Sequence, residues 1–399
     1  MNSSRSLRRP ARILLVAVIY LIAGKLGLRL AFVNPSATAV WPPTGIALAA
    51  LLILDHQVWP GVFLGAFLVN ITTAGSIATS VGIAVGNTLE ALVGCYLVNR
   101  FAHGDKAFSR AQDIFRFAAL AGLVSTSVSA TLGVASLSLG GLARWSEFGA
   151  IWSTWWLGDA GGALVVAPLL VLWLRDPHLR WTRAQVAEAV VLLIGILFIG
   201  QSVFGGFFPS STRNYPLEFL CIPFLIWAAF RFSPRETAVA TFVIAAIAIS
   251  GTLAGFGPFV RGSKNESLVL LQVYVGISAV TGLALAALVS ERKEIAEKLQ
   301  RLAASDALTG LANSLRVLAQ APAYGFTVAQ ARILLLRLKE GRTSRLIFIP
   351  DEHDVSHLPG WVRAPKQITD GHLSKLASAK GAVLATLDES IAGSYLIPR

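Results

Sequence analysis

Four ionisable residues interrupt the apolar runs of this sequence, where a charge is costly. Lys25 and Arg29 are four residues apart, so they share one face of an expected helix. Glu90 and Asp159 lie inside two other apolar runs. Because an unpaired charge at bilayer depth is unfavourable, we expect Lys25, Arg29 or backbone donors to partner the two carboxylates, in a structural or sensory role. The alternatives are that Lys25 and Arg29 reach the headgroups from the outer end of their helix, and that Asp159 lies at an aromatic belt.

The elements that must position these residues are membrane helices. Hydrophobic residues make up 54% of the 399 residues and charged residues only 14%, against about 25% charged in soluble domains. A spanning helix needs about 20 mostly apolar residues. Runs of that kind lie at 12–33, 78–99, 117–138, 149–174, 185–205, 216–231, 236–256 and 267–290. The composition therefore predicts a membrane protein and excludes a large soluble core.

The stretch 44–71 differs from the other apolar runs. Its two shorter apolar pieces are separated by Asp55, His56, Gln57 and Pro60, and they form either two short crossings or one re-entrant hairpin. The predicted fold is an all-α polytopic membrane bundle of about eight transmembrane helices, or ten if this stretch crosses twice. A small α/β cytoplasmic fragment is expected after the bundle.

Basic residues in the short loops predict the orientation. The N-terminus and the loops near 100–116, 175–183 and 231–235 are rich in Lys and Arg, which favours the cytoplasmic side. Both termini are therefore expected in the cytoplasm of a bacterium, with the bundle in its inner membrane and an uncleaved first helix. Arg261 and Lys264 break the pattern on the outer side. The net charge of +12 is explained by these loops, and no nucleic acid partner is expected.

Cys95 and Cys221 both lie in apolar runs without a CxxC or Cys/His spacing nearby. They are predicted to be buried free thiols, with no disulfide and no metal site.

Two long motifs are similar to a known family. Residues 34–70 contain WPPTGIALAALL followed by WPG and LGAFLVN, and residues 152–172 read WSTWWLGDAGGALVVAPLLVL. The segment 12–290 thereby resembles the membrane-associated sensor domain of the MASE class, first type. Such domains precede diguanylate cyclases and histidine kinases in bacteria and pass a signal to them. The resemblance implies a sensor motif that comprises Trp41, Pro42, Pro43, Gly45, Trp59, Asn70, Glu90, Trp156, Gly158 and Asp159.

The residue types of these motifs have simple physical consequences. Pro42 restricts Trp41 to an extended conformation, and both Pro42 and Pro43 suit the start of a helix. Small residues such as Gly61 and Gly65 allow helices to approach closely. Plain bundle packing is also the expected role of Gly161 and Gly162.

After Ser290 the sequence becomes polar. Residues 291–313 are predicted to contain a linker helix and then the octapeptide DALTGLAN at 306–313. The linker helix is a candidate contact surface for a homodimer. This octapeptide resembles the opening of a GGDEF diguanylate cyclase domain. The GG(D/E)EF signature that binds GTP does not follow in residues 314–399. The cyclase output is therefore expected to be truncated.

Residues 314–399 resemble the later part of a VapC-like PIN ribonuclease, and a partial α/β domain is expected. In that family four acidic side chains hold Mg²⁺ or Mn²⁺, and Asp370 and Asp388 match two of them. The segment that carries the first strand of the family has no counterpart here, so the metal cage is incomplete. We expect no cofactor, with weak Mg²⁺ or Mn²⁺ binding at Asp370 and Asp388 left open.

The sequence thus predicts a bacterial membrane sensor or signalling domain without an enzymatic output, embedded in the lipid bilayer. One alternative is residual metal-dependent ribonuclease activity through Asp370 and Asp388. A second is a small-solute transporter whose path is lined by Lys25, Glu90 and Asp159, although no inverted repeat is evident.

Overall fold

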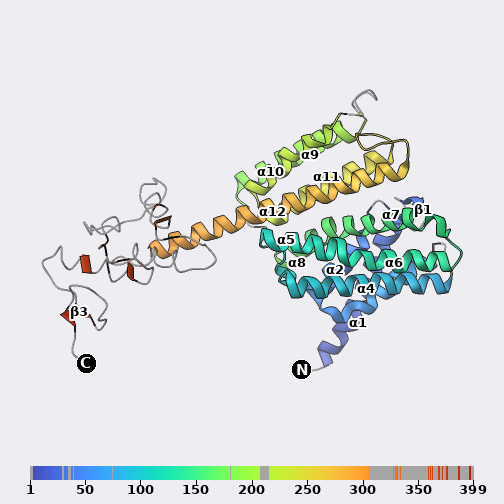
Figure 1. Ribbon diagram of the computed structural model, residues 1–399, viewed down its shortest axis with the longest axis horizontal. Helices are drawn as coiled ribbons and strands as arrows, with labels where there is room; N and C mark the ends of the chain where they lie inside the picture. Colours follow the sequence, from blue (N-terminus) through green and yellow to red (C-terminus); the bar gives the residue numbers. More distant parts are fainter. Residues whose placement is uncertain are drawn as a thin grey trace. The chain divides into compact units, whose positions relative to one another are not determined.

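In the computed structural model the chain forms two compact units, Met1–Glu291 and Arg292–Arg399. The structure describes residues 3–304 except 29–30, 35–36, 39, 74, 180 and 207–214, and short stretches between 327 and 396. The described part of the first unit is a bundle of helices that run side by side (Figure 1). Its helices are α1 (Ser3–Leu28), α2 (Pro42–Leu54), α3 (Trp59–Ile71), α4 (Ile77–Phe101), α5 (Ala111–Phe117), α6 (Ser125–Leu139), α7 (Phe148–Gly161), α8 (Ala167–Arg175), α9 (Arg183–Phe204), α10 (Ile222–Arg231), α11 (Pro234–Leu253) and α12 (Lys264–Ala304).

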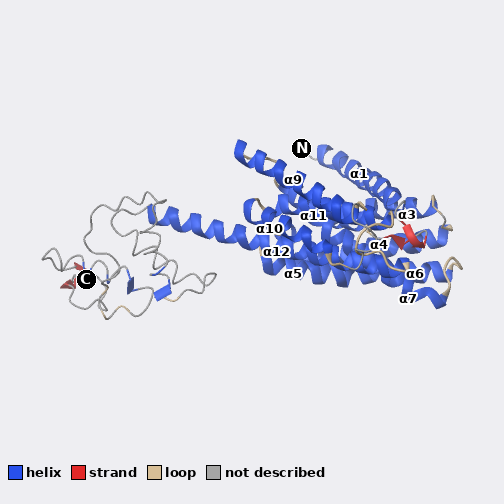
Figure 2. Ribbon diagram, turned by 90° about the horizontal axis from the view of Figure 1, so that it is seen from above, coloured by secondary structure: helices blue, strands red, loops and turns tan. Residues whose placement is uncertain are grey.

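Short elements join these helices. The 3₁₀ turns are η1 (His56–Val58), η2 (Gly104–Lys106), η4 (Trp145–Glu147) and η7 (Leu217–Cys221), and the π-helical segments are η3 (Ala118–Val124) and η5 (Gly162–Val166). The strands β1 (Ala31–Asn34) and β2 (Ala37–Thr38) pair in an antiparallel hairpin, drawn in red in Figure 2. In the second unit, β3 (Ala385–Thr386) pairs in parallel with β4 (Tyr395–Leu396).

Seven helices within the described residues are long and apolar enough to cross a membrane. They are Arg9–Leu28, Ile77–Phe101, Ala111–Leu139, Trp145–Arg175, Arg183–Phe204, Pro234–Leu253 and Asn265–Lys298. The predicted all-α polytopic membrane bundle is thereby confirmed. The expected eighth long run, 216–231, forms η7 and the ten-residue α10 instead, because Pro216 and Pro223 each stand at the start of a new element.

The apolar stretch 44–71 forms two helices of 13 residues, α2 and α3. At 1.5 Å per residue each is about 20 Å long, which is shorter than the hydrocarbon core of a bilayer. Most residues of α2 are buried, and this helix packs against α1, α4, α8 and η5. The bundle is thus built around a short central helix whose first turn lies deep in the interior.

The basic loops meet at one end of the bundle. The Arg175 guanidinium donates to the carbonyl of Asp105 over 3.3 Å, and the Arg235 guanidinium donates to the carbonyl of Asp176 over 2.6 Å. Arg110 lies 3.9 Å from a carboxylate oxygen of Glu291, where α12 leaves the bundle. The loops that sequence analysis assigns to one side of the membrane therefore lie together.

Candidate functional site

Three polar side chains meet in the interior of the bundle, and each comes from a different helix. Thr44 of α2, Glu90 of α4 and Asp159 of α7 are 7%, 2% and 0% exposed. The Thr44 hydroxyl lies 3.0 Å from Asp159 Oδ1 and 3.4 Å from Glu90 Oε2. Two carboxylates thus share one hydroxyl group, which has only one proton to donate.

The motif Trp41-Pro42-Pro43 brings Thr44 to this place. The two prolines occupy the first positions of α2, where a missing N–H costs nothing. The backbone N–H of Trp41 donates to the carbonyl of Gly158 over 2.9 Å, one residue before Asp159. The chain therefore enters α2 directly beside the carboxylate on α7.

Two glycines allow the backbones of α2 and η5 to touch. A Cβ atom built on Gly45 would lie 2.6 Å from Val166 Cβ and 2.8 Å from the backbone nitrogen of Ala167. A Cβ atom built on Gly162 would lie 2.9 Å from the carbonyl carbon of Trp41. Gly162 therefore has the expected role of allowing close helix packing, and Gly45 has the same role on the facing helix α2.

Both π-helical segments lie beside this joint and contact each other. The Leu164 side chain of η5 packs against Gly122 of η3, where a Cβ atom would be only 2.9 Å away. Side chains satisfy carbonyl groups of η3: the Trp156 indole donates to Leu123 over 2.9 Å, and the Thr126 hydroxyl donates to Gly122 over 2.9 Å. Trp156 of the sensor motif therefore supports η3 and does not line the carboxylate pair.

A chain of buried hydrogen bonds lies on the same helices. Trp155 donates to Ser129 over 3.1 Å, Ser129 donates to the Asn87 carbonyl over 2.7 Å, and the Asn87 amide donates to the Tyr20 hydroxyl over 2.9 Å. All four residues are buried. Sequence reasoning missed this network and Thr44; the available signal was Asn87, which lies three residues before Glu90 on the same helix face.

Each carboxylate retains one oxygen without a hydrogen-bond partner. Glu90 Oε1 and Asp159 Oδ2 are buried and accept no hydrogen bond from the described residues. Neither carboxylate forms an ion pair with a described side chain, as the salt bridges of that part of the chain all involve other acids. An unpartnered carboxylate oxygen in such a place costs about 1–3 kcal/mol or more, so the pair calls for a physical explanation.

The expected ion pair between Lys25 and the carboxylates is not formed. The Lys25 ammonium donates to the Thr73 hydroxyl over 2.8 Å, in an exposed position after α3. Lys25 stands near the end of α1, so its long side chain extends to the surface and not into the interior. Arg29 lies outside the described residues. Of the three residues proposed to line a transporter path, Glu90 and Asp159 therefore lie together, whereas Lys25 lies apart from them.

The remaining motif residues have structural positions. The Asn70 amide donates to the carbonyl of Ala66 within α3 over 2.9 Å. Trp59 begins α3 and is 44% exposed. Gly61 and Gly65 face Ile13 and Tyr20 of α1, where added Cβ atoms would clash.

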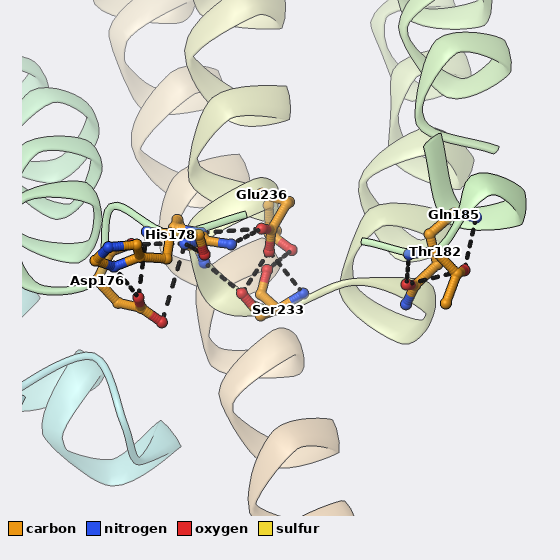
Figure 3. Close-up of polar contacts among 8 residues, drawn as sticks. Asp176, His178, Thr182, Gln185, Ser233 and Glu236 are labelled. Atoms are coloured by element: carbon orange, nitrogen blue, oxygen red, sulfur yellow. Dashed lines mark hydrogen bonds and ion pairs between the residues drawn. The ribbon is translucent and has the colours of Figure 1, made fainter. Parts of the chain in front are cut away.

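A second polar cluster lies at the end of the bundle where the basic loops meet (Figure 3). Ser233 caps α11 and contacts Glu236, and the Arg235 guanidinium donates to Glu236 over 2.7 Å. The same guanidinium reaches the carbonyl groups of Asp176 and His178 over 2.6 and 3.1 Å. This cluster fastens the loop after α8 to the start of α11, which is a structural role.

The C-terminal candidates lie outside the described residues. This applies to Asp370, Asp388 and the GGDEF-like octapeptide 306–313. Within the part of the chain that the structure describes, no three His, Cys, Asp or Glu side chains form a group that could hold a metal. Cys95 and Cys221 are free and buried, as expected.

Comparison with known proteins agrees with the membrane part of this description. The model of the MASE1 family matches residues 11–293, whereas the GGDEF-like and PIN-like segments lie beyond the match. No curated protein and no solved structure matches the chain. Since the matched range covers well over half of the 399 residues, the chain belongs to the MASE1 family of membrane sensor domains.

Proposed function

We propose that this protein is a bacterial inner-membrane sensor, with both termini in the cytoplasm, that passes a signal from the bundle along α12. The observation that carries the proposal is the continuity of α12, which runs unbroken over 41 residues from Lys264 to Ala304. Its membrane part is packed in the bundle through buried residues such as Leu271 and Ala279. Its continuation after Glu291 is mostly exposed.

The carboxylate pair is coupled to α12 through α7 and η5. The Thr154 hydroxyl, five residues before Asp159, donates to the Asn265 side chain of α12 over 2.7 Å. Leu164 of η5 lies next to Gly276 of α12, at 3.5 Å from the position of a Cβ atom there. A change at the carboxylate pair that moves α7 and η5 therefore also moves α12.

Cysteine cross-linking in membranes tests this proposal, with Cys95 and Cys221 as buried and therefore weakly reactive thiols. Within α12 the sequence spaces Leu288, Ile295, Leu299 and Leu302 by seven, four and three residues, which is typical of one apolar seam along a helix. Ile295 lies on this seam, and Glu294 lies beside it. In a homodimer, Ile295→Cys should form a disulfide and Glu294→Cys should not. When Asp159→Asn is combined with Ile295→Cys, the rate of disulfide formation between the two chains should change several-fold. A rate that is the same with and without Asp159→Asn contradicts transmission from this site.

The proposal extends to the output: the diguanylate cyclase domain is truncated after Asn313, and the PIN-like tail lacks half of its acidic residues. The full-length protein should then make no cyclic di-GMP from GTP. It should also cleave no RNA with excess Mn²⁺, beside an Asp370→Asn, Asp388→Asn control. Cleavage that is lost in this double variant would establish the ribonuclease alternative.

A further inference from the structure

Among the residues that the structure describes, no positive charge lies within reach of the buried carboxylate pair. Lys25 is bonded to Thr73 at the surface, and the other described ion pairs use different acids. Two ionised carboxylates side by side in a low-dielectric interior repel each other, and each also loses its hydration. A positively charged ligand would relieve both effects at once.

The distances around the Thr44 hydroxyl are compatible with metal ligands as well as with hydrogen bonds. The 3.4 Å between Thr44 Oγ1 and Glu90 Oε2 is long for a hydroxyl donor, whose usual range ends at about 3.0 Å. Oxygen ligands at right angles around a cation at about 2.1–2.4 Å are separated by about 3.0–3.4 Å. The two distances from the Thr44 hydroxyl, 3.0 and 3.4 Å, fall in that interval.

A second observation points to the same place. The free oxygens Glu90 Oε1 and Asp159 Oδ2 belong to side chains that are at least nine-tenths buried, so each carboxylate offers a vacant acceptor.

We propose that Thr44, Glu90 and Asp159 bind one divalent cation of the hard, oxygen-preferring class, such as Mg²⁺, Ca²⁺ or Mn²⁺. Two charges on the cation neutralise two carboxylates, whereas a monovalent ion leaves one negative charge buried. The ligands available are carboxylate and hydroxyl oxygens, which this class prefers over nitrogen and sulfur. This cation site rests on the proposed sensor function, because it is the same carboxylate pair. Cation binding is measured directly, so it can be tested separately from signalling.

The test uses full-length protein in lipid nanodiscs, freed of metal with EDTA and titrated with Mn²⁺. An Asp370→Asn, Asp388→Asn background removes the C-terminal candidates. We expect about one bound Mn²⁺ per chain by electron paramagnetic resonance, competed by Mg²⁺ or Ca²⁺. Glu90→Gln and Asp159→Asn should each weaken binding about tenfold or more, since each removes a charged ligand. Glu147→Gln, at an exposed carboxylate, should leave it unchanged.

Thr44 provides an independent check if loss of a carboxylate prevents folding. Thr44→Ser keeps the hydroxyl and should keep Mn²⁺ binding, whereas Thr44→Val should weaken it. The proposal is overturned if no Mn²⁺ binds, or if binding survives Glu90→Gln and Asp159→Asn. It is also overturned if the melting temperature responds to pH through these carboxylates but not to divalent ions, because the pair then holds protons. Mn²⁺ binding with an unchanged cross-linking rate would refute the signalling role alone.

Discussion

Replacing Gly162 by alanine tests the close joint between α2 and the helix that carries Asp159. The new Cβ atom would stand 2.9 Å from the carbonyl carbon of Trp41, which is backbone and can move only together with α2. Overpacking of this kind costs about 1–3 kcal/mol, occasionally more. Alanine in place of a helical glycine contributes about 0.5–1 kcal/mol in the opposite direction. The difference between these two estimates is about 0–2.5 kcal/mol. Because the nearest atoms, the carbonyl oxygen and carbon of Trp41, are backbone, we expect a net destabilisation in the upper part of that range, at about 1–2 kcal/mol.

The matched control is Gly149→Ala, in α7 of the same continuous helix, where no atom lies within 4 Å of an added Cβ. Only the helix preference acts there, so stability should rise slightly. Thermal unfolding in detergent, followed by size-exclusion fluorescence, should show a lower Tm for Gly162→Ala by about 2–8 °C, at about 2–4 °C per kcal/mol. The same Tm rise for Gly162→Ala as for Gly149→Ala would refute the close-packing argument.

Three further predictions concern other parts of the bundle. Thr44→Val leaves two buried carboxylates without their shared hydroxyl and should cost about 1–3 kcal/mol, whereas Thr44→Ser should cost less; an equal Tm for both variants would contradict this. Topology reporters fused after Asp105 and after Ser290 should both indicate the cytoplasm, and a periplasmic result at either position would reverse the orientation. Arg235→Ala removes a guanidinium that is only 11% exposed and should lower the Tm. Arg144→Ala removes one that is 81% exposed and should change the free energy of unfolding by less than about 1 kcal/mol, so its Tm should stay close to that of the unaltered protein.

The sequence was sufficient for the membrane class and for most of the spans, because long apolar runs have few alternative explanations. It was not sufficient for 216–231, where the composition is largely apolar and Pro216 and Pro223 decide that the helix is short. The division of 44–71 into α2 and α3 was foreseeable from the polar residues near Asp55. The entry of Trp41 into the interior was not foreseeable, because it depends on a hydrogen bond to Gly158, more than a hundred residues later.

For the candidate site, the two carboxylates could be predicted from the sequence, but their hydrogen-bond partner Thr44 could not. Glu90 and Asp159 stand out because an acid in an apolar run is rare. Thr44 does not stand out, since threonine is common in membrane helices and its hydroxyl usually bonds within its own helix. Its charge favours Lys25 as a partner of the carboxylates, whereas its place near the end of α1 decides that it bonds to Thr73 at the surface.

The π-helical segment η5 is a point at which the rotation of α8 relative to α7 can change. A π segment holds one residue more per turn than an α-helix, so its five residues Gly162–Val166 amount to an insertion. Deleting one of them would let α7 and α8 join as a regular α-helix. Residues after the deletion would then keep the faces they now occupy, whereas relaxing η5 to a regular α-helix without a deletion would turn them by about 100° relative to Asp159. Interconversion of η5 between π and α geometry would therefore rotate α8 relative to α7 in one step while the helix stays continuous.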